Sequence, residues 1–342
     1  MSSPNPSRVT GVRPLWALEG GRLEITGSGF TVDPLPDVRV GSLPARVSSV
    51  SSATLAITVP SGLEGGRTPI RIDSAPGETA FVEVAAPLAT GLHQVDNPAF
   101  DSVGNLYVTF SGSRGQEAPV AIYIVRPDGT REPFVSGIRN PTSLTFDGEG
   151  RLHVSSRFDG TVHRVNDDGT ATIIATDLGV ACGIAFDADG VLFVGDRSGS
   201  ILRVGHRRAV TVATLPASVA AFHIAFGPDG ALFVTGPTLS TRDCIYRVSM
   251  DGGVSVFYEG FGRPQGLAFD DEGRLYVVDA LAGGGGLYRF DAEGSREPEL
   301  LIDSGGLVGL ALSAEGMLAL ASSDTLYRLD AAVRGLLPFT RS

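Results

Sequence analysis

The sequence contains no lysine. All 27 of its Lys-plus-Arg residues are arginine, against 38 acidic residues, and the formal net charge at pH 7 is −11. The absence of lysine excludes a Schiff-base lysine, a P-loop lysine and a lysine general base. An acidic chain with scattered arginines also lacks the basic surface that nucleic-acid binding requires. We therefore expect no nucleic-acid partner.

Cysteine and long apolar runs are equally scarce. Only Cys182 and Cys244 are present, too few for a disulfide framework or a four-cysteine zinc site. Each lies in an apolar, strand-like run, and we predict two free thiols that are mostly buried. No apolar run reaches the length of a membrane span, so we expect none.

A signal peptide is also not visible, because residues 1–10 show no basic stretch followed by an apolar core. We therefore predict a cytoplasmic protein. A chain whose leader had been removed would have the same sequence, so an extracellular or cell-surface location stays open.

Glycine and proline, in contrast, are abundant. The chain has 45 glycines and 21 prolines along its length, and 42% of its residues are hydrophobic. Frequent turn residues favour many short strands over long helices. The apolar content is sufficient for a large core and argues against a disordered chain.

The N-terminal part of the chain shows short alternating runs separated by Gly and Pro. They cover residues 22–26, 38–40, 45–50, 54–59, 68–73 and 79–84. Short strands interrupted at short intervals by turn residues favour a β-sandwich. The only tryptophan, Trp16, is interpreted as packing at the end of this sandwich, with a ligand-contact role as the alternative.

Three longer strings in this part carry a family resemblance. They are VRPLWALEGGRLEITGSGF (12–30), VRVGSLPARV (38–47) and LAITVPSGLEGGRTPIRI (55–72). Together they resemble the IPT/TIG domain, which implies an immunoglobulin-like fold that acts as a spacer, adhesion or binding module.

The remainder of the chain is an internal repeat. Five related copies and a weaker sixth are AFDSVGNLYV (99–108), TFDGEGRLHV (145–154), AFDADGVLFV (185–194), AFGPDGALFV (225–234), AFDDEGRLYV (268–277) and ALSAEGMLAL (311–320). Each copy contains two strands and is followed by two further apolar runs. Four short strands per unit of about 40 residues, without a helical period, predict a propeller blade. Six copies predict six blades.

Two polar features recur in the repeat. Asp-x-x-Gly stands between the first two strands, and we interpret its aspartate as a turn former and not as a catalytic acid. An arginine recurs at one register of the third strand, which indicates packing or inter-blade pairing. These arginines are Arg164, Arg203, Arg247, Arg289 and Arg328.

The repeats resemble the NHL and gluconolactonase-like (senescence-marker/strictosidine-synthase-like) six-bladed propellers, most clearly in NPTSLTFDGEGRLHVSS (140–156) and RPQGLAFDDEGRLYVVD (263–279). This resemblance is specific for the fold and not for an activity. We expect an all-β chain with a flexible N-terminus (1–7), an immunoglobulin-like sandwich (8–86) and a propeller (87–342). Either APLATGLHQV (86–95) or GLLPF (335–339) is expected to close the ring by supplying a fourth strand.

A site in such a propeller is expected at the mouth of the central channel, where the innermost strands begin. The candidate ligand-binding residues at these strand starts are Asp96, Asn97, Cys182 and Gln265, and Asp196 and Asp279 follow second strands on the rim. His223 is the only histidine at this level and is the candidate catalytic residue. His153 and His163 are interpreted as packed strand residues.

The resemblance to gluconolactonases implies a divalent cation held by Glu, Asn and Asp. Here the corresponding positions are Pro264-Gln265-Gly266, Cys182 and Phe222, and only Asp96 remains as a candidate oxygen ligand. A bound Ca²⁺ or similar cation therefore stays an open expectation, with no cofactor assigned.

Three functions follow from these observations. The first is a binding or scaffolding protein whose propeller face contacts a protein, a glycan or a small ligand, favoured by the uneven loops 109–121, 235–244 and 279–286. The second is a metal-assisted, lactonase-like hydrolase. The third is a lyase that uses His223, as streptogramin-lyase-type propellers use a central histidine with a metal, although those usually have seven blades.

Overall fold

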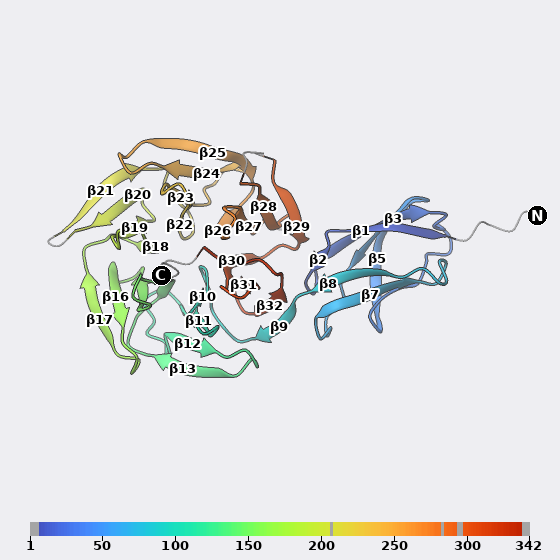
Figure 1. Cartoon of the computed structure of the whole chain (residues 1–342), viewed down its shortest axis with the longest axis horizontal. Coiled ribbons are helices and arrows are strands. Elements are labelled where there is room, and N and C mark those ends of the chain that lie inside the picture. Colours follow the sequence, from blue (N-terminus) through green and yellow to red (C-terminus); the bar gives the residue numbers. More distant parts are fainter. Residues whose placement is uncertain (1–6, 206–207, 282–283, 293–296, 337–342) are drawn as a thin grey trace, which may run out of the picture.

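The computed structural model describes residues 7–205, 208–281, 284–292 and 297–336, and every regular element in them is a β-strand. The predicted all-β fold is thus confirmed. A sandwich lies beside a ring of small sheets (Figure 1). Residues 1–6 of the predicted flexible N-terminus lie outside the described ranges, whereas Ser7 is buried and its Oγ donates to Gly29 O (2.7 Å).

The N-terminal sandwich contains eight strands, two more than the alternating runs predicted. They are β1 (Arg8–Arg13), β2 (Trp16–Ala17), β3 (Arg22–Ser28), β4 (Val38–Val40), β5 (Leu43–Val50), β6 (Thr54–Thr58), β7 (Gly66–Ile72) and β8 (Ala80–Val84). Strand β5 pairs with β4 at one end and with β6 at the other, and so joins the two layers. Alternate residues of β3 and β6, such as Leu23, Ile25, Leu55 and Ile57, are fully buried between the layers.

The ring consists of short antiparallel sheets, each with its first strand innermost. Its strands are β9 (Ala86–Ala89), β10 (Ala99–Phe100), β11 (Leu106–Thr109), β12 (Ile122–Val125), β13 (Arg131–Val135), β14 (Pro141–Phe146), β15 (Leu152–Ser156), β16 (Thr161–Val165), β17 (Ala171–Ala175), β18 (Ala181–Phe186), β19 (Leu192–Asp196), β20 (Ser200–Val204), β21 (Ala209–Thr214), β22 (His223–Phe226), β23 (Leu232–Thr235), β24 (Asp243–Val248), β25 (Val254–Phe261), β26 (Pro264–Phe269), β27 (Leu275–Asp279), β28 (Gly286–Phe290), β29 (Glu299–Asp303), β30 (Leu307–Leu312), β31 (Met317–Ser322) and β32 (Leu326–Asp330).

The prediction of six blades is corrected to five. The five separate four-stranded sheets are β10–β13, β14–β17, β18–β21, β22–β25 and β30–β31–β32–β9. Strands β26–β29 of the fifth repeat instead belong to a twelve-stranded sheet, because the outer strand β29 pairs with β3 of the sandwich at Asp303 and Arg22. The same two side chains form an ion pair of 3.3 Å. The sandwich thereby covers a strand edge that would otherwise be open.

Ring closure is provided by the N-terminal segment. Strand β9 pairs with β32, with Ala89 opposite Leu326 and Ala86 opposite Arg328. The C-terminal run forms no such strand within the described ranges, because Gly335 makes a single bridge to Asp270. Residues 337–339 of the predicted GLLPF strand lie outside those ranges.

Apolar side chains also join the sandwich to the ring. Leu18 and Ala85 are buried in one cluster with Leu301 and Leu329 of the propeller, and Trp16 packs against this cluster. Tyr327 donates a hydrogen bond to Glu19 (3.3 Å). Trp16 therefore lies at the end of the sandwich, as predicted, and also borders the propeller core.

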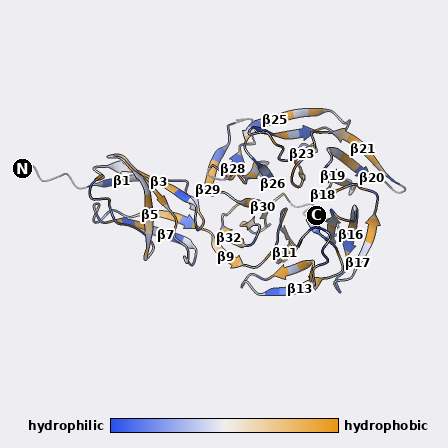
Figure 2. Cartoon of the chain, turned by 180° about the vertical axis from the view of Figure 1, so that it is seen from behind, coloured by the Kyte–Doolittle hydropathy of each residue, from blue (hydrophilic) through white to orange (hydrophobic). Residues whose placement is uncertain are grey.

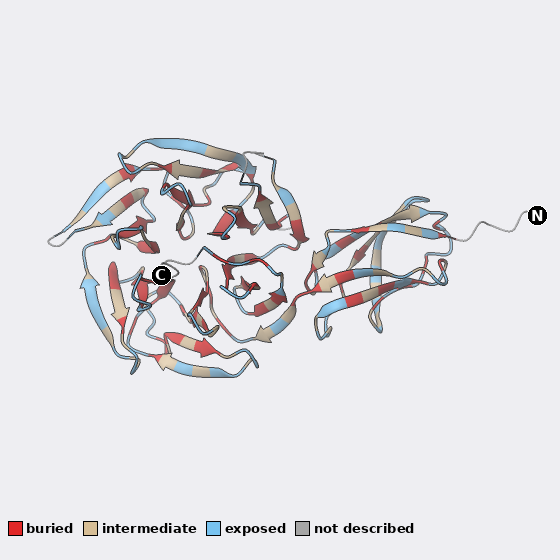
Figure 3. Cartoon of the chain, in the orientation of Figure 1, coloured by how far each residue is buried: buried red, intermediate tan, exposed pale blue. Residues whose placement is uncertain are grey.

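Neighbouring repeats are joined by a recurring aromatic contact. The phenylalanine that ends an innermost strand packs edge-on against a ring from the second strand of the preceding repeat. The pairs, with centroids 4.8 to 5.4 Å apart, are Phe146 on Tyr107, Phe186 on His153, Phe226 on Phe193 and Phe269 on Phe233. Figure 2 shows the hydrophobic residues on the strands, and Figure 3 shows the inner strands buried and the outer ones largely exposed. The interpretation of His153 as a packed residue is confirmed.

The Asp-x-x-Gly segments form the predicted turns. In the second repeat, Asp147 Oδ1 accepts the backbone N–H groups of Glu149 and Arg151 (2.9 and 3.0 Å), and Gly150 has a φ of 76°. Asp147 Oδ2 contacts Arg151 Nε (2.7 Å) and His153 Nε2 (3.0 Å). Burial raises the pKa of Asp147, but these hydrogen bonds outweigh it and lower the pKa to about 2.

The innermost strands approach most closely where they begin, which we call the upper end of the ring. A Cβ on Gly309 would lie 2.6 Å from Asp96 O, and one on Gly183 would lie 2.6 Å from Phe222 O. Gly183 N also donates to Phe222 O of the next repeat (2.8 Å). Only glycine allows this approach, which explains why three repeats carry it at this register.

Replacing Gly309 with alanine is expected to lower the free energy of unfolding by about 2 kcal/mol, because the added methyl group must displace backbone atoms. Thermal unfolding measured by circular dichroism tests this. Gly284→Ala is the control, since its Cβ meets only Leu281 Cδ2 at 4.0 Å. Equal midpoints for the two variants would contradict the close approach.

Asp147 is expected to make stability depend on acid. Its folded pKa lies below its unfolded value, so its contribution is complete above about pH 4 and is lost as the pH falls toward 2. The full contribution corresponds to about 2 kcal/mol. Denaturation of the wild type and Asp147→Asn between pH 6 and 2 should show curves that converge in acid. Parallel curves would refute the assignment.

Candidate functional site

Asp96 and His223 meet at the centre of the upper end. Asp96 precedes the innermost strand of the first repeat, and His223 begins β22 in the fourth. His223 Nδ1 and Asp96 Oδ1 are 2.6 Å apart, and the two residues are 0% and 3% exposed. Two sequence-predicted site residues from distant repeats are thus in direct contact.

The outer atoms of this pair make no hydrogen bond to the described residues: these atoms are Asp96 Oδ2 and His223 Nε2. Asp96 Oδ1 also accepts the backbone N–H of Asn97 (2.6 Å), and a carboxylate oxygen can accept a second hydrogen bond from His223 Nδ1. In a neutral ring whose proton is on Nδ1, His223 Nε2 is the acceptor. A histidine oriented by a carboxylate in this way is suited to accept a proton.

The side chain of Asn97 joins three innermost strands. Its Nδ2 donates to Leu267 O (3.0 Å), and its Oδ1 accepts the N–H of Leu310 (3.0 Å). The amide occupies space left by the missing side chain of Gly266. Asn97 is therefore held as a structural link at the ring centre.

Cys182 and Gln265 are buried at the same level. Burial, with the nearby charge of Asp96, raises the pKa of the Cys182 thiol to about 11, so the thiol is protonated at neutral pH and is a poor nucleophile. The carbonyl of Gln265 accepts the Thr235 hydroxyl (2.5 Å). Both cysteines are free and Cys182 is buried, as predicted. Cys244, which was predicted to be mostly buried, is only half-buried.

Asp196 and Asp279 hold the backbones of their loops. Asp196 Oδ1 accepts the N–H of Val180 (2.8 Å), and Asp279 Oδ1 accepts that of Arg263 (2.7 Å). Burial raises the pKa of Asp279, and its hydrogen bonds to backbone N–H groups oppose this. These two carboxylates are engaged with loop backbone, whereas Asp96, Asn97 and His223 meet one another.

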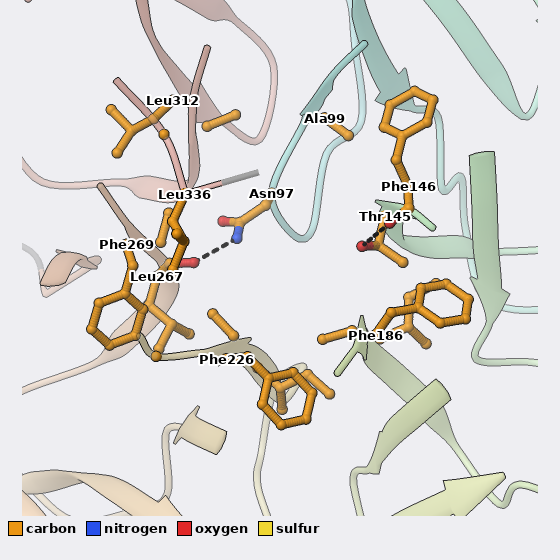
Figure 4. Close-up of a pocket in the computed structure, with 18 of the residues that line it drawn as sticks. Asn97, Ala99, Thr145, Phe146, Phe186, Phe226, Leu267, Phe269, Leu312 and Leu336 are labelled. Atoms are coloured by element: carbon orange, nitrogen blue, oxygen red, sulfur yellow. Dashed lines mark hydrogen bonds between the residues drawn. The ribbon is translucent and has the colours of Figure 1, made fainter. Parts of the chain in front are cut away.

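A cavity of about 570 Å³ lies at the opposite, lower end, where the innermost strands finish. Figure 4 shows phenylalanines, leucines and small side chains around it, with Asn97 on one side. One register of the innermost strands lines it in every repeat and is always small. These residues are Ala99, Thr145, Ala185, Ala225, Ala268 and Ala311.

The lower cavity was not predicted. Of the predicted site residues, Asn97 lines it, whereas Asp96, Cys182, His223 and Gln265 do not. The signal that identifies it in the sequence is the small residue before each phenylalanine of the repeat, which leaves space around the axis. The predicted site consisted mainly of polar residues, so it did not include this register of small residues.

Comparison with known proteins identifies the N-terminal domain. Residues 7–80 match the family model of the IPT/TIG domain, and they form the sandwich described above. The chain thus combines a TIG domain with a β-propeller. No curated protein matches the sequence. In the described part of the chain no helix has the length and apolar character to cross a membrane.

Solved structures resemble the chain in fold. An auxiliary nutrient binding protein from Bacteroides ovatus has a TM-score of 0.54 at 14% identity, over 95% of this chain and 98% of its own. A putative gluconolactonase has a TM-score of 0.59 at 17% identity, over 74% and 93%. A streptogramin B lyase has a TM-score of 0.51 at 15% identity, over 96% and 95%. At these identities the likeness shows the fold alone.

Replacing Asp96 with asparagine is expected to lower the free energy of unfolding by about 3 kcal/mol, because it removes the charged partner of a fully buried histidine. Chemical denaturation at pH 7 measures the change. Asp189→Asn removes the same charge from an exposed side chain and should have little effect. Similar losses in both variants would show that net charge, not the buried contact, is responsible.

Proposed function

We propose that the protein is a binding protein that holds a small, mostly apolar molecule in the lower cavity. The observation that carries this proposal is the cavity itself, whose volume of about 570 Å³ lies within the range of small-molecule sites. Its wall of alanines, leucines, isoleucines and phenylalanines favours apolar surface over charge.

The few polar groups of the cavity indicate the chemistry of the ligand. Ser143 and Thr145 line it beside Asn97, whose amide is already bonded to Leu267 and Leu310. The inner edges of the innermost strands are not paired with another strand, so their backbone N–H and C=O groups can bond a ligand where no side chain engages them, as Ser143 engages Ile184 N. Asp187 and Asp189 border the cavity and disfavour an anion. The ligand is therefore expected to be neutral or cationic, with a hydrogen-bonding group.

From the sequence we predicted that the loops of the upper end bind the ligand. We now propose the lower end instead, because the cavity lies there. The fold of an auxiliary nutrient binding protein, which matches both domains, supports a binding role. In this proposal the repeats are of the NHL and gluconolactonase-like kind. The TIG domain (8–86) acts as a spacer that carries the propeller (87–342).

An enzyme that uses His223 is the second candidate, favoured by the Asp96 contact and the free Nε2. A hydrolase or lyase of the metal-dependent kind would need a set of ligands. The residues present do not fit a cation, because Asn97 already serves two backbone groups and Cys182 is held protonated. Among the described residues, no group of three or more His, Cys, Asp or Glu is arranged to hold a metal.

The binding proposal is tested with Nile red, a neutral apolar dye, titrated into the protein by fluorescence. We expect saturable binding at one site, and Thr145→Phe should weaken it at least tenfold by filling the cavity. Thr172→Phe adds the same bulk to an exposed position on the outer strand β17 and should bind like the wild type. Absence of saturable binding, or equal weakening in both variants, would reject the proposal.

A further inference from the structure

The lower cavity reaches the surface mainly at turns of the third and fourth repeats. It extends along β18 from Ile184 in the strand to Asp189 in the turn beyond it. The exposed residues of its lining are Ala188, Asp189, Pro228, Gly230, Met250 and Leu336. All of them except Leu336 belong to the turns that follow β18, β22 and β24. A molecule in the cavity therefore has its outer end beside these turns.

The charge at this mouth is negative. Asp187 and Asp189 are the only charged residues among the described residues that line the cavity. Asp187 Oδ1 accepts the backbone N–H groups of Asp189 and Val191 (both 2.9 Å). Its second oxygen and the carboxylate of Asp189 make no hydrogen bond or ion pair with the part of the chain that the structure describes. One carboxylate and half of another thus remain available.

Arginine neutralises the acids of the equivalent turns in the second and fifth repeats. The pairs are Arg151 with Asp147 and Glu149 (2.7 and 2.6 Å) and Arg274 with Asp270 and Glu272 (2.6 and 2.8 Å). The third repeat has Val191 at the position of these two arginines. Its two acids are therefore not neutralised in the way that those of its sister repeats are.

The fourth repeat neutralises its turn from a different strand, because Arg247 of β24 pairs with Asp229 (2.6 Å). Arg203 of β20 has the same register in the third repeat. Within the described ranges, however, Arg203 forms no ion pair with Asp189, and it does not line the cavity. The acidic turn of the third repeat thus borders the cavity mouth without a cationic partner.

A buried hydroxyl in the same cavity has a donor that is not used. Ser143 lines the cavity and is 4% exposed, and its Oγ accepts the N–H of Ile184 (3.3 Å). Its O–H donates to none of the described residues. A buried donor without an acceptor is unfavourable, so this hydroxyl is suited to a polar atom of a bound molecule. It is an indication of a ligand that is independent of the acidic turn.

We propose that the ligand of the lower cavity is an organic cation, with an ammonium or similar group beside Asp187 and Asp189 and an apolar body along β18. This inference rests on the binding proposed above for the cavity and specifies the class of ligand. Negative charge at the mouth of a cavity attracts and orients a cation, whereas the apolar walls bind the rest of the molecule. The same charge selects against carboxylates and phosphates.

The test is isothermal titration of the full chain with octylamine, 1-octanol and octanoate at pH 7 and low ionic strength. The probes share one apolar chain, and only the amine is a cation at this pH. Ile184 and Asp187 are separated by about 10 Å of extended chain, a span suited to eight carbons. Octylamine should bind about fivefold more tightly than octanol, as expected of an exposed ion pair. Octanoate should bind more weakly than either.

Two variants should remove the preference for octylamine and leave octanol binding unchanged. Asp189→Asn removes the available carboxylate. Val191→Arg places an arginine where Arg151 stands in the second repeat, so it can pair with both acids. Its control is Val191→Gln, which adds a long side chain without charge and should keep the preference. Asp167→Asn removes an exposed acid from the turn between β16 and β17, outside the cavity lining, and should bind all probes like the wild type.

Equal affinities for octylamine and octanol, or a preference that survives both Asp189→Asn and Val191→Arg, would overturn the inference and leave binding in the cavity intact. Loss of the preference in Asp167→Asn would also overturn it, because the net charge would then be responsible. Octylamine binding that Thr145→Phe does not weaken would place the amine outside the cavity. If neither octanol nor Nile red binds, the cavity itself is rejected as a binding site, and the inference with it. Thermal unfolding verifies that each variant is folded.

Discussion

The close approach of the innermost strands at their starts determines where the ring is closed and where it is hollow. Gly183, Gly266 and Gly309 let neighbouring backbones touch at the upper end. Because the strands meet there, Asp96 and His223 reach each other from distant repeats and fill the axis. Below this level the phenylalanines of the second to fifth repeats pack on rings of the preceding repeats, and the small register beside them leaves space around the axis. One packing constraint thus produces both the buried polar centre and the cavity.

The two ends of the ring consequently differ in chemistry. The upper end holds buried polar atoms that make no hydrogen bond to the described residues, such as Asp96 Oδ2 and His223 Nε2. The lower end has apolar walls, and its turns carry aspartates such as Asp187 and Asp189 at the rim.

Much of this architecture could be predicted from the sequence, because it rests on local and repeated patterns. The alternating runs predicted six of the eight sandwich strands, and each Asp-x-x-Gly marked a turn, as at Asp147. The sequence placed Asp96 and His223 at the starts of innermost strands, but it could not predict their direct contact, because that contact depends on how the ring closes. The joining of β29 to β3 was not accessible, because a pair of residues as ordinary as Arg22 and Asp303 carries no signal of it. The cavity could not be predicted in the same way, because it is formed by small residues, mainly alanines, and an alanine carries no functional group that would draw attention to a site.

The pairing of β9 with β32 has a consequence for the order in which the protein assembles. The strand that completes the last sheet is made before all other strands of the ring, and its partner is made last of the ring strands. The ring cannot close until β32 has been synthesised, so β9 has no strand partner during most of synthesis. Pairing β9 with β32 closes a loop that contains nearly the whole propeller, and closing a loop of that length is slow. The TIG domain emerges first, and its last strand, β8, ends two residues before β9 begins, with Ala85 buried between them. An early-folding sandwich thus anchors one end of the gap, and the final strand docks onto a partner already held in place.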